Sequence, residues 1–301
     1  MTSPADPGQG SASASASTPD ADLTGWIGRS ETGQDTLTAA PLIALAATLD
    51  HPVAAVQAGA ALPPLWHWLY FLPMHRQSEI GPDGHPRRGG FMPPVPLPRR
   101  MWAGSQFEFH SPVRVGDAVT RQSTLEDVST KHGRSGTLVF VKLRHALFCN
   151  GAVQPALVEF HDIVYREAQR PGDVAPPPQA APAQATWQRQ IEPDAVLLFR
   201  YSALTFNGHR IHYDRPYATQ VEGYPGLVVH GPLIATLLLD LLRRELPGAE
   251  LASFRFRAVR PTFDQQPFRV SATLLPDGKT VQLWAQDHEG WLTMDASATL
   301  R

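Results

Sequence analysis

The chain has 301 residues, of which 43% are hydrophobic and 18% charged, enough apolar material for one large domain or two smaller ones. A formal net charge of −2 leaves no broad basic surface for binding nucleic acid. The single cysteine, Cys149, excludes an intramolecular disulfide and argues against a thiolate metal cluster.

Residues 1–21 consist largely of Ser, Ala, Gly, Pro and Asp. This composition buries too little apolar surface to offset the entropy of ordering, so we predict a disordered tail. The tail lacks the charged and apolar regions of a secretory signal and has no arginine before Arg29. No later segment reaches the roughly 18 apolar residues that a membrane helix requires. We therefore expect a cytoplasmic protein that does not enter the membrane.

Residues 22–167 contain a segment of helical period at 41–50, followed by several runs in which polar and apolar residues alternate. In one run Val139, Val141 and Leu143 share a face, as in a half-buried strand. Residues 168–186 are rich in Pro and Ala and predict an extended, semi-rigid linker. The first half is thus expected to be one folded unit, separated by this linker from the rest of the chain.

Residues 187–301 repeat the layout of the first half. An apolar helix is expected at 231–246, followed by strands with a hairpin turn at Pro276-Asp277-Gly278. Helix before antiparallel strands in both halves predicts the α+β class. Residues 233–242 are apolar on nearly every side, so a curved sheet has to wrap them. The best packing solution is a double hotdog, with two long helices each wrapped by an antiparallel sheet.

A polar cluster lies just before the apolar helix. Asn207, His209, His212 and Asp214 fall within eight residues, and the helix is headed by His230 and Gly231. A metal site is the weakest interpretation, because these residues lack the frame of a known zinc motif. Asp214, two residues before Pro216, is expected to cap a short helix. For His230 a capping role and a functional one both stay open, and so does a structural role for His209.

Acid–base chemistry fits the cluster better. A histidine titrates near neutral pH and can transfer a proton. The N–H of Gly231 lies at the positive end of the helix, where it can stabilise an oxyanion such as a polarised thioester carbonyl. A base and an oxyanion site beside an apolar slot suit proton transfer next to a carbonyl group.

The order N-x-H-x-x-H, Asp, Gly and His-Gly resembles the MaoC-type (R)-specific enoyl-thioester hydratases, which carry D-x-N-P-x-H in the same frame. The stretches 70–109, 199–214 and 222–233 are similar to a subgroup of that family. This subgroup contains mesaconyl-C4-CoA hydratases, itaconyl-CoA hydratases and 3-hydroxyacyl-thioester dehydratases. The resemblance covers most of residues 60–301, and both halves match in order.

The resemblance implies a hydro-lyase that adds water to a short, dicarboxylic enoyl-CoA or removes it. The substrate is an acyl-CoA, and no cofactor is expected beyond its coenzyme A. By position, Asn207 stands at the family's catalytic Asp, His209 at its Asn, His212 at its catalytic His, and Gly231 at the glycine that polarises the thioester. Because an amide cannot exchange a proton at neutral pH, we assign the proton transfer to His212. Asn207 would orient water or substrate, and His209 would assist or support.

The Gly- and Pro-rich segment 81–102 is too long for a simple connector. It is either a wall of the acyl pocket, with arginines that bind CoA phosphates or a substrate carboxylate, or a braced surface loop with solvated arginines. The candidate substrate-binding residues are His230, Arg88, Arg99, Arg100 and Arg210.

The first half lacks an N-x-H-x-x-H counterpart, so we expect one active site per chain and a first half that forms the acyl-pocket wall. Three alternatives stay open: a dehydratase of fatty-acid metabolism, a hotdog thioesterase and a non-catalytic acyl-CoA-binding module. Hotdog units often pair, which is compatible with a homodimer or with pairing inside one chain.

Overall fold

The computed structural model describes residues 23–52, 56–87, 89–133, 136–168 and 177–301. The predicted disordered tail therefore lies outside the described residues, as do Arg88 and the first part of the predicted linker. Among the described residues, none of the helices has both the length and the apolar character needed to span a bilayer.

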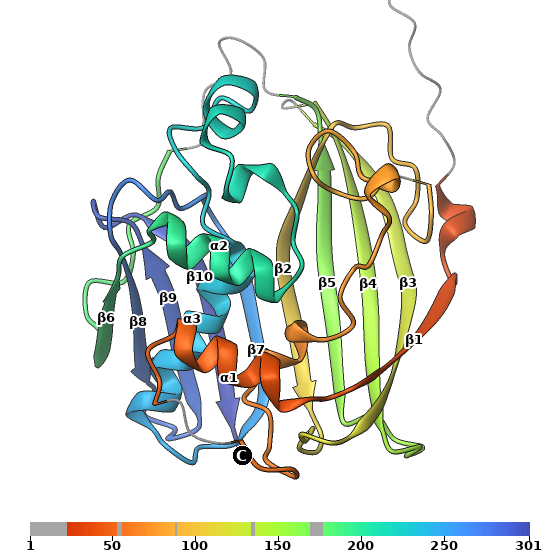
Figure 1. The fold of residues 1–301 in the computed structure, drawn as a ribbon. Helices are drawn as coiled ribbons and strands as arrows, with labels where there is room; N and C mark the ends of the chain where they lie inside the picture. Colours follow the sequence, from red (N-terminus) through yellow and green to blue (C-terminus); the bar gives the residue numbers. More distant parts are fainter. Residues whose placement is uncertain (1–22, 53–55, 88, 134–135, 169–176) are drawn as a thin grey trace, which may run out of the picture.

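Ten strands form one continuous antiparallel sheet (Figure 1). They are β1 (Ser30–Thr36), β2 (Arg99–Phe109), β3 (Ala118–Gly133), β4 (Gly136–Cys149), β5 (Leu157–Arg166), β6 (Trp187–Ile191), β7 (Leu251–Ala258), β8 (Phe268–Leu274), β9 (Thr280–Gln286) and β10 (Leu292–Leu300). Their order across the sheet is β1-β3-β4-β5-β2-β7-β10-β9-β8-β6. The two halves thus contribute one side of the sheet each, as expected for two hotdog units.

The halves are joined by the pairing of β2 with β7, from Gly104 opposite Arg257 to Glu108 opposite Ser253. A Cβ atom on Gly104 would lie only 2.4 Å from the carbonyl oxygen of Phe256. Only glycine allows the two backbones to approach this closely, so this residue is required where the halves meet.

The described helices are α1 (Ala39–Thr48), α2 (Ala195–Leu204) and α3 (Gly231–Glu245), with short helical turns η1 (Thr24–Trp26), η2 (Trp66–Leu69), η3 (Gln77–Glu79), η4 (Arg210–His212) and η5 (Tyr217–Val221). Every residue of α3 from Leu233 to Leu242 is buried, and the helix packs against β6, β8, β9 and β10. This confirms the expected wrapped helix. The first-half helix, α1, has only ten residues and packs on α2 and η2, so the two halves differ in this element.

Asp240 is the one acidic residue in the buried part of α3, Leu233–Leu242, and its carboxylate is completely buried. Arg189, Arg243 and Arg244 approach it at 2.9, 3.0 and 2.8 Å, and His51 also bonds to it. These ion pairs and hydrogen bonds offset the free-energy cost of removing the carboxylate from water, so a charged residue can be buried in the apolar helix.

The apolar side chains form two clusters. The larger surrounds α3, and the smaller lies among β3, β4 and β5. Between them runs a row of polar residues that face each other across the strands, Ser123, His145 and Glu159. On the same face, Leu143 of the smaller cluster lies two residues before His145, and Leu147 of the larger one two residues after it. We call Ser123, His145 and Glu159 the polar row, because they separate the two apolar clusters on this face of the sheet.

Glu159 lies at the β5 end of the polar row and is 2% exposed. It accepts hydrogen bonds from Trp68 Nε1 at 3.0 Å and from the rings of His67 and His161. Burial alone would raise the pKa of its carboxyl group, but the two histidines outweigh burial and lower this pKa well below its usual range. The wall of the first half therefore contains a buried negative charge.

The described end of the predicted linker is part of the fold. The N–H of Ala181 donates to Gly290 at 3.0 Å, and the carbonyl of Gln179 accepts from Leu292 at 2.8 Å. This segment is therefore fixed along the turn between β9 and β10. The predicted hairpin turn is confirmed, because the N–H of Leu275 donates to Thr280 across Pro276-Asp277-Gly278.

Candidate active site

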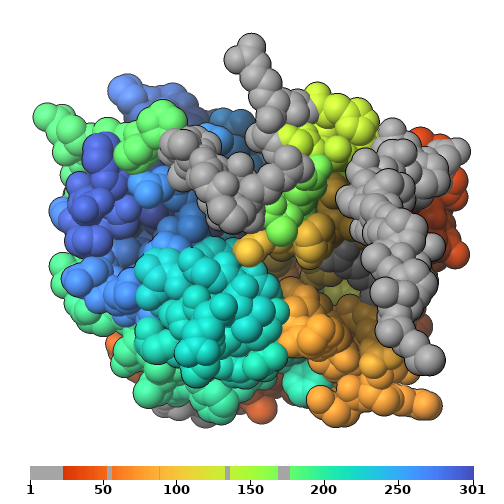
Figure 2. Space-filling view, turned by 90° about the horizontal axis from the view of Figure 1, so that it is seen from above, coloured from red at the N-terminus to blue at the C-terminus, as the bar shows by residue number. Residues whose placement is uncertain are grey.

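The polar cluster lies in the segment between α2 and α3, directly beside residues of the first half. In the view from above, the atoms that follow α2 (cyan) adjoin first-half residues (orange) (Figure 2). Asn207 begins the segment, and its side-chain oxygen accepts a hydrogen bond from the N–H of His209 at 3.1 Å. Asp214 accepts from the N–H of Tyr217 at 3.1 Å, which confirms it as the cap of the turn that follows.

His212 is the best placed proton acceptor in this segment. It is 8% exposed, and its Nδ1 lies 2.7 Å from the carbonyl oxygen of Val228. A carbonyl oxygen can only accept, so Nδ1 carries the hydrogen and Nε2 carries the lone pair. Burial lowers the pKa of His212 to about 4, although the bond to Val228 acts in the opposite direction. At neutral pH the ring is therefore uncharged and able to take up a proton at Nε2.

His230 supports His212 from the side. The two rings stack with centroids 3.7 Å apart and an angle of 18° between their planes. His230 is 1% exposed, and its Nε2 lies 2.8 Å from the hydroxyl of Ser202. Burial, with His212 and His209 nearby, lowers the pKa of His230 well below its usual value. A neutral ring in this position fixes the plane of His212, so its contacts favour a positioning role.

Gly231 is the first residue of α3, and Pro232 follows it. A Cβ atom added to Gly231 would meet no described atom within 4 Å, and the backbone is not in the left-handed region that favours glycine. Neither packing nor backbone conformation requires a glycine here. The empty space beside its Cα, at the positive end of a fifteen-residue helix, is suited to an approaching oxyanion.

Replacing Gly231 by alanine should therefore separate function from stability. We expect the free energy of unfolding to stay unchanged or rise by up to about 1 kcal/mol, because alanine is the better helix former. The ratio kcat/KM should fall about 10- to 100-fold, because the methyl group fills the space that a thioester needs. Urea unfolding and a hydration assay measure the two effects.

Gly25→Ala is the matched control, since a Cβ there also meets no described atom within 4 Å and it lies in η1. It should leave both quantities unchanged. Full activity in Gly231→Ala would contradict the placement of the substrate carbonyl at α3.

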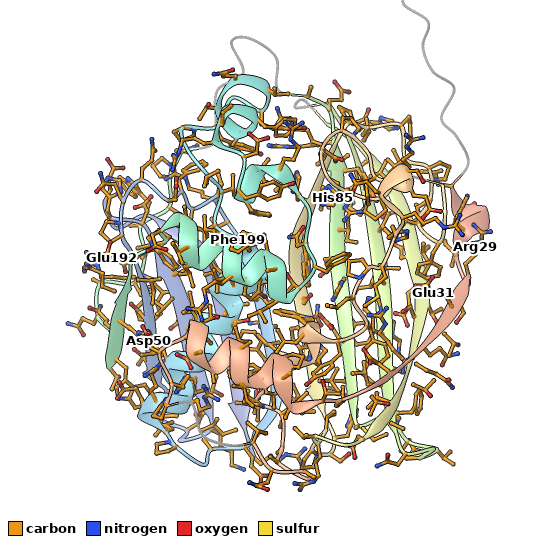
Figure 3. The ribbon with its side chains drawn as sticks, viewed as in Figure 1. Arg29, Glu31, Asp50, His85, Glu192 and Phe199 are labelled. Atoms are coloured by element: carbon orange, nitrogen blue, oxygen red, sulfur yellow. The ribbon has the colours of Figure 1, made fainter. Side chains whose placement is uncertain are left out.

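A loop from the first half, residues 81–87, reaches the same site. A Cβ atom on Gly84 would lie 1.8 Å from the carbonyl oxygen of Gly208, so the two backbones touch. The N–H of Arg210 donates to Asp83 O at 2.9 Å, and its Nη1 donates to Pro82 O at 3.0 Å. These contacts bring His85 beside the segment that follows α2 (Figure 3).

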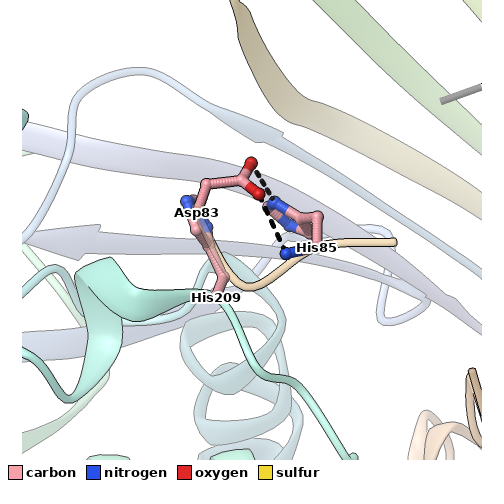
Figure 4. A group of neighbouring side chains, drawn as sticks. All are labelled: Asp83, His85 and His209. Atoms are coloured by element: carbon pink, nitrogen blue, oxygen red, sulfur yellow. Dashed lines mark hydrogen bonds and ion pairs between the residues drawn. The ribbon is translucent and has the colours of Figure 1, made fainter. Parts of the chain in front are cut away.

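Asp83, His85 and His209 form a compact group in which nitrogen and carboxylate atoms lie within 4.8 Å of one another (Figure 4). One Asp83 oxygen accepts from the backbone N–H of His85, and the other bonds to its Nδ1, both at 3.0 Å. With both carboxylate oxygens engaged by His85, the pair is a carboxylate–imidazole dyad rather than an open set of metal ligands. This dyad was not predicted from the sequence. The length of the loop and its glycines were the only features that pointed to a functional role for it.

His209 lies between the dyad and His212. Its ring centroid is 4.0 Å from that of His85 and 5.4 Å from that of His212. Burial, reinforced by His85 and His212, lowers the pKa of His209 to about 2. The ring is therefore neutral, and it supports its neighbours more readily than it donates a proton.

The candidate arginines differ in their surroundings. Arg99 pairs with the carboxylate of Glu222 at 2.7 Å, and Arg210 pairs with Asp214 at 2.7 Å. Both guanidinium groups are thus engaged by acidic partners, which favours a structural role over the predicted binding of substrate. Arg100 is exposed, and its charge is close enough to His209 to contribute to lowering the pKa of that ring. Of the described candidates, Arg100 is the one placed to meet an anionic substrate.

Comparisons with known proteins identify the family of this chain. The family model for hydroxyacyl-thioester dehydratase type 2 matches residues 65–264. The chain is 46% identical to mesaconyl-C(4)-CoA hydratase of Chloroflexus aurantiacus, over 93% of this chain and 98% of that protein. It is 28% identical to the mitochondrial hydroxyacyl-thioester dehydratase type 2 of Schizosaccharomyces pombe, over 83% of this chain and 91% of the relative.

Solved structures confirm the fold. A MaoC-like dehydratase from Phytophthora capsici superimposes with a TM-score of 0.68 at 16% identity, covering 91% of this chain and 96% of the other. A Mycobacterium tuberculosis protein with a double hotdog fold gives a TM-score of 0.55 at 14% identity, covering 91% and 96%. The predicted α+β double hotdog is therefore confirmed, and the chain belongs to the hydroxyacyl-thioester dehydratase type 2 family of MaoC-like hotdog enzymes.

Proposed function

We propose that this hydro-lyase acts on a short dicarboxylic enoyl-CoA of the mesaconyl-C4 class. Its enoyl-CoA hydratase or dehydratase activity follows from its family and from its 46% identity to a mesaconyl-C(4)-CoA hydratase. The observation that carries the chemistry is His212, neutral and buried, whose ring stacks on His230, the residue directly before Gly231 and α3. A base and an oxyanion donor are the two groups that addition of water to an unsaturated thioester needs.

In the hydration direction, His212 Nε2 takes a proton from water while the water oxygen forms a bond to Cβ of the substrate. The electron pair of the C=C bond moves toward the thioester and forms an enolate, whose oxygen accepts a hydrogen bond from the Gly231 N–H. A proton added to Cα completes the 3-hydroxyacyl thioester. Dehydration runs through the same steps in reverse.

The polar row favours a substrate with a short, polar acyl group over one with a long fatty chain. In our assignment the first half forms the acyl-pocket wall, and a fatty chain requires such a wall to be continuously apolar. Glu159 and His145 interrupt the concave face between the two apolar clusters. A methylene chain placed there would lie against a carboxylate and an imidazole instead of the apolar side chains that a fatty-acyl pocket needs.

A panel of thioesters tests the proposal. Loss of enoyl-thioester absorbance is followed with crotonyl-CoA, mesaconyl-C4-CoA, itaconyl-CoA and a 16-carbon 2-enoyl-CoA. We expect kcat/KM for a dicarboxylic ester to exceed that for the 16-carbon ester by about 100-fold, which corresponds to about 2.7 kcal/mol of transition-state binding.

Equal or faster turnover of the long-chain ester would instead indicate a dehydratase of fatty-acid metabolism. Release of free thiol would indicate a thioesterase, and tight binding without turnover would indicate an acyl-CoA-binding module. The absence of a further cofactor, the cytoplasmic location and the homodimer stay predictions from sequence.

A further inference from the structure

The proposed reaction moves two protons, and the second proton has no carrier in the segment that supplies His212. In the D-x-N-P-x-H pattern of the MaoC-type hydratases, which this segment resembles, the position of Asn207 holds an aspartate, and an amide cannot exchange a proton in its place. The oxygen of Asn207 is also used in the local turn, where it accepts from the N–H of His209. A second acid–base group therefore has to come from another part of the molecule.

The first half brings one titratable pair to this place. His85 bonds through Nδ1 to the Asp83 carboxylate, and the same carboxylate holds its backbone N–H, which fixes both the ring and the loop. The side chains of His85 and Asp83 are 22% and 39% exposed, so the pair is open enough to exchange protons with solvent. His212, by contrast, is nearly completely buried.

The position of the dyad is built into the fold. Gly84, with φ of +90°, lies against Gly208, and any side chain at Gly84 would collide with that backbone. Arg210 adds two hydrogen bonds to the loop, at Pro82 and Asp83. The glycine contact and the two hydrogen bonds of Arg210 together hold His85 beside the segment that carries His209 and His212.

We propose that His85, oriented by Asp83, is the second catalytic proton-transfer residue of the active site, supplied by the first half. The proposal deepens the proposed function and rests on it. The first half thereby contributes to the chemistry itself, in addition to lining the acyl pocket.

The protons and electrons balance as follows. His212 accepts a proton from water as the C–O bond forms at Cβ, and the π electrons form the enolate. Protonated His85 then gives its Nε2 proton to Cα, and the enolate electron pair forms the new C–H bond. The proton on His212 returns through solvent to His85, so both rings recover their starting state. In dehydration, His85 removes the Cα proton and His212 protonates the departing hydroxide.

Kinetics of single variants test this assignment on the full-length protein with mesaconyl-C4-CoA. We expect His85→Gln to lower kcat by about 10²- to 10³-fold with KM within about threefold of wild type, as for loss of a general acid. Asp83→Asn should lower kcat by about tenfold, because the ring stays but loses its fixed orientation. His75→Gln is the control, since His75 is a half-exposed histidine of the same half, paired only with Glu79, and should be unchanged.

Hydrogen exchange at Cα separates a catalytic role from a structural one. In D2O, wild type should exchange the Cα protons of butyryl-CoA, a saturated thioester that cannot be hydrated, and His85→Gln should lose this exchange. The measurement does not depend on hydration, so it reports on His85 even if the panel shows no hydratase activity and the proposed function fails.

Three results would overturn the proposal. One is Cα exchange in His85→Gln at the wild-type rate, and another is an increase in KM with unchanged kcat, which would indicate substrate binding alone. The third is loss of activity on dialysis against a chelator with recovery on adding Zn²⁺, which would make Asp83, His85 and His209 a metal site.

Discussion

Replacement of His212 by glutamine is expected to reduce kcat by about three orders of magnitude while the fold is retained. The Nε2 lone pair of His212 is the group that activates water, and general-base loss costs on the order of 10²- to 10⁴-fold. Glutamine keeps a side-chain N–H that can still donate to Val228, so the loop before α3 should hold its conformation. Steady-state hydration kinetics and a circular dichroism melt measure the two effects.

His288→Gln is the matched control for this variant. His288 is exposed in the turn between β9 and β10, in the same half of the chain but outside the site. It should keep wild-type kinetics. If His212→Gln retained more than about a tenth of kcat, His212 would not be the base, and His85 would be left as the principal proton carrier.

Local sequence rules were sufficient for the features that depend on neighbouring residues. The helix predicted at 231–246 forms as Gly231–Glu245, because its apolar residues can be buried only as one wrapped helix. The turn at Pro276-Asp277-Gly278 and the cap at Asp214 also formed as expected. For the turn and the cap, the deciding hydrogen bond joins residues no more than five positions apart.

Local sequence rules did not predict contacts between residues that are far apart in the sequence. The junction of β2 with β7 depends on the close approach that Gly104 allows, and nothing around Gly104 in the sequence names its partner. The end of the predicted linker is fixed against Gly290 and Leu292 for the same reason. Composition predicted an extended linker at 168–186, but it could not name the strands beside it.

In the candidate active site, too, residues close in sequence were predicted and contacts between distant segments were not. His209, His212 and Gly231 were found because they are close in sequence and frame the start of one helix. The Asp83–His85 dyad was not, because its relation to His209 is created by contact between Gly84 and Gly208. The glycines of the 81–102 segment were a usable signal, since a glycine that touches another backbone marks a place where two segments must meet.

Acidification between about pH 6.5 and pH 4.5 is expected to unfold the protein. The pKa values of His145, His209 and His212 are lowered to about 3, about 2 and about 4, mainly by burial, and that of His230 is well below its usual value. In the unfolded chain each histidine titrates near 6.5. Below that pH these four histidines are protonated in the unfolded chain but stay neutral in the folded protein, so unfolding takes up four protons.

The loss of folding stability at low pH follows from proton linkage. Stability rises with pH wherever the unfolded state binds more protons, so it must fall as the pH drops below 6.5. Each histidine contributes about 1.4 kcal/mol per pH unit, and four together contribute about 5 kcal/mol per pH unit. Two pH units therefore remove about 10 kcal/mol, which exceeds the stability of a domain in the lower half of the usual range of about 5–15 kcal/mol.

Urea unfolding at pH 7.5, 6.5, 5.5 and 5.0, followed by tryptophan fluorescence, measures this slope. Replacing His145 by asparagine, which can still bond to Ser123, should lower the slope by about a quarter while His209, His212 and His230 stay in place. A stability that does not change between pH 7.5 and 5.0 would show that the buried rings are charged when folded. Three of these four histidines lie together in the active site, where His212 stacks on His230 and meets His209 edge-on. The burial that keeps His212 a neutral base therefore also makes the fold sensitive to acid, and one cannot be changed without the other.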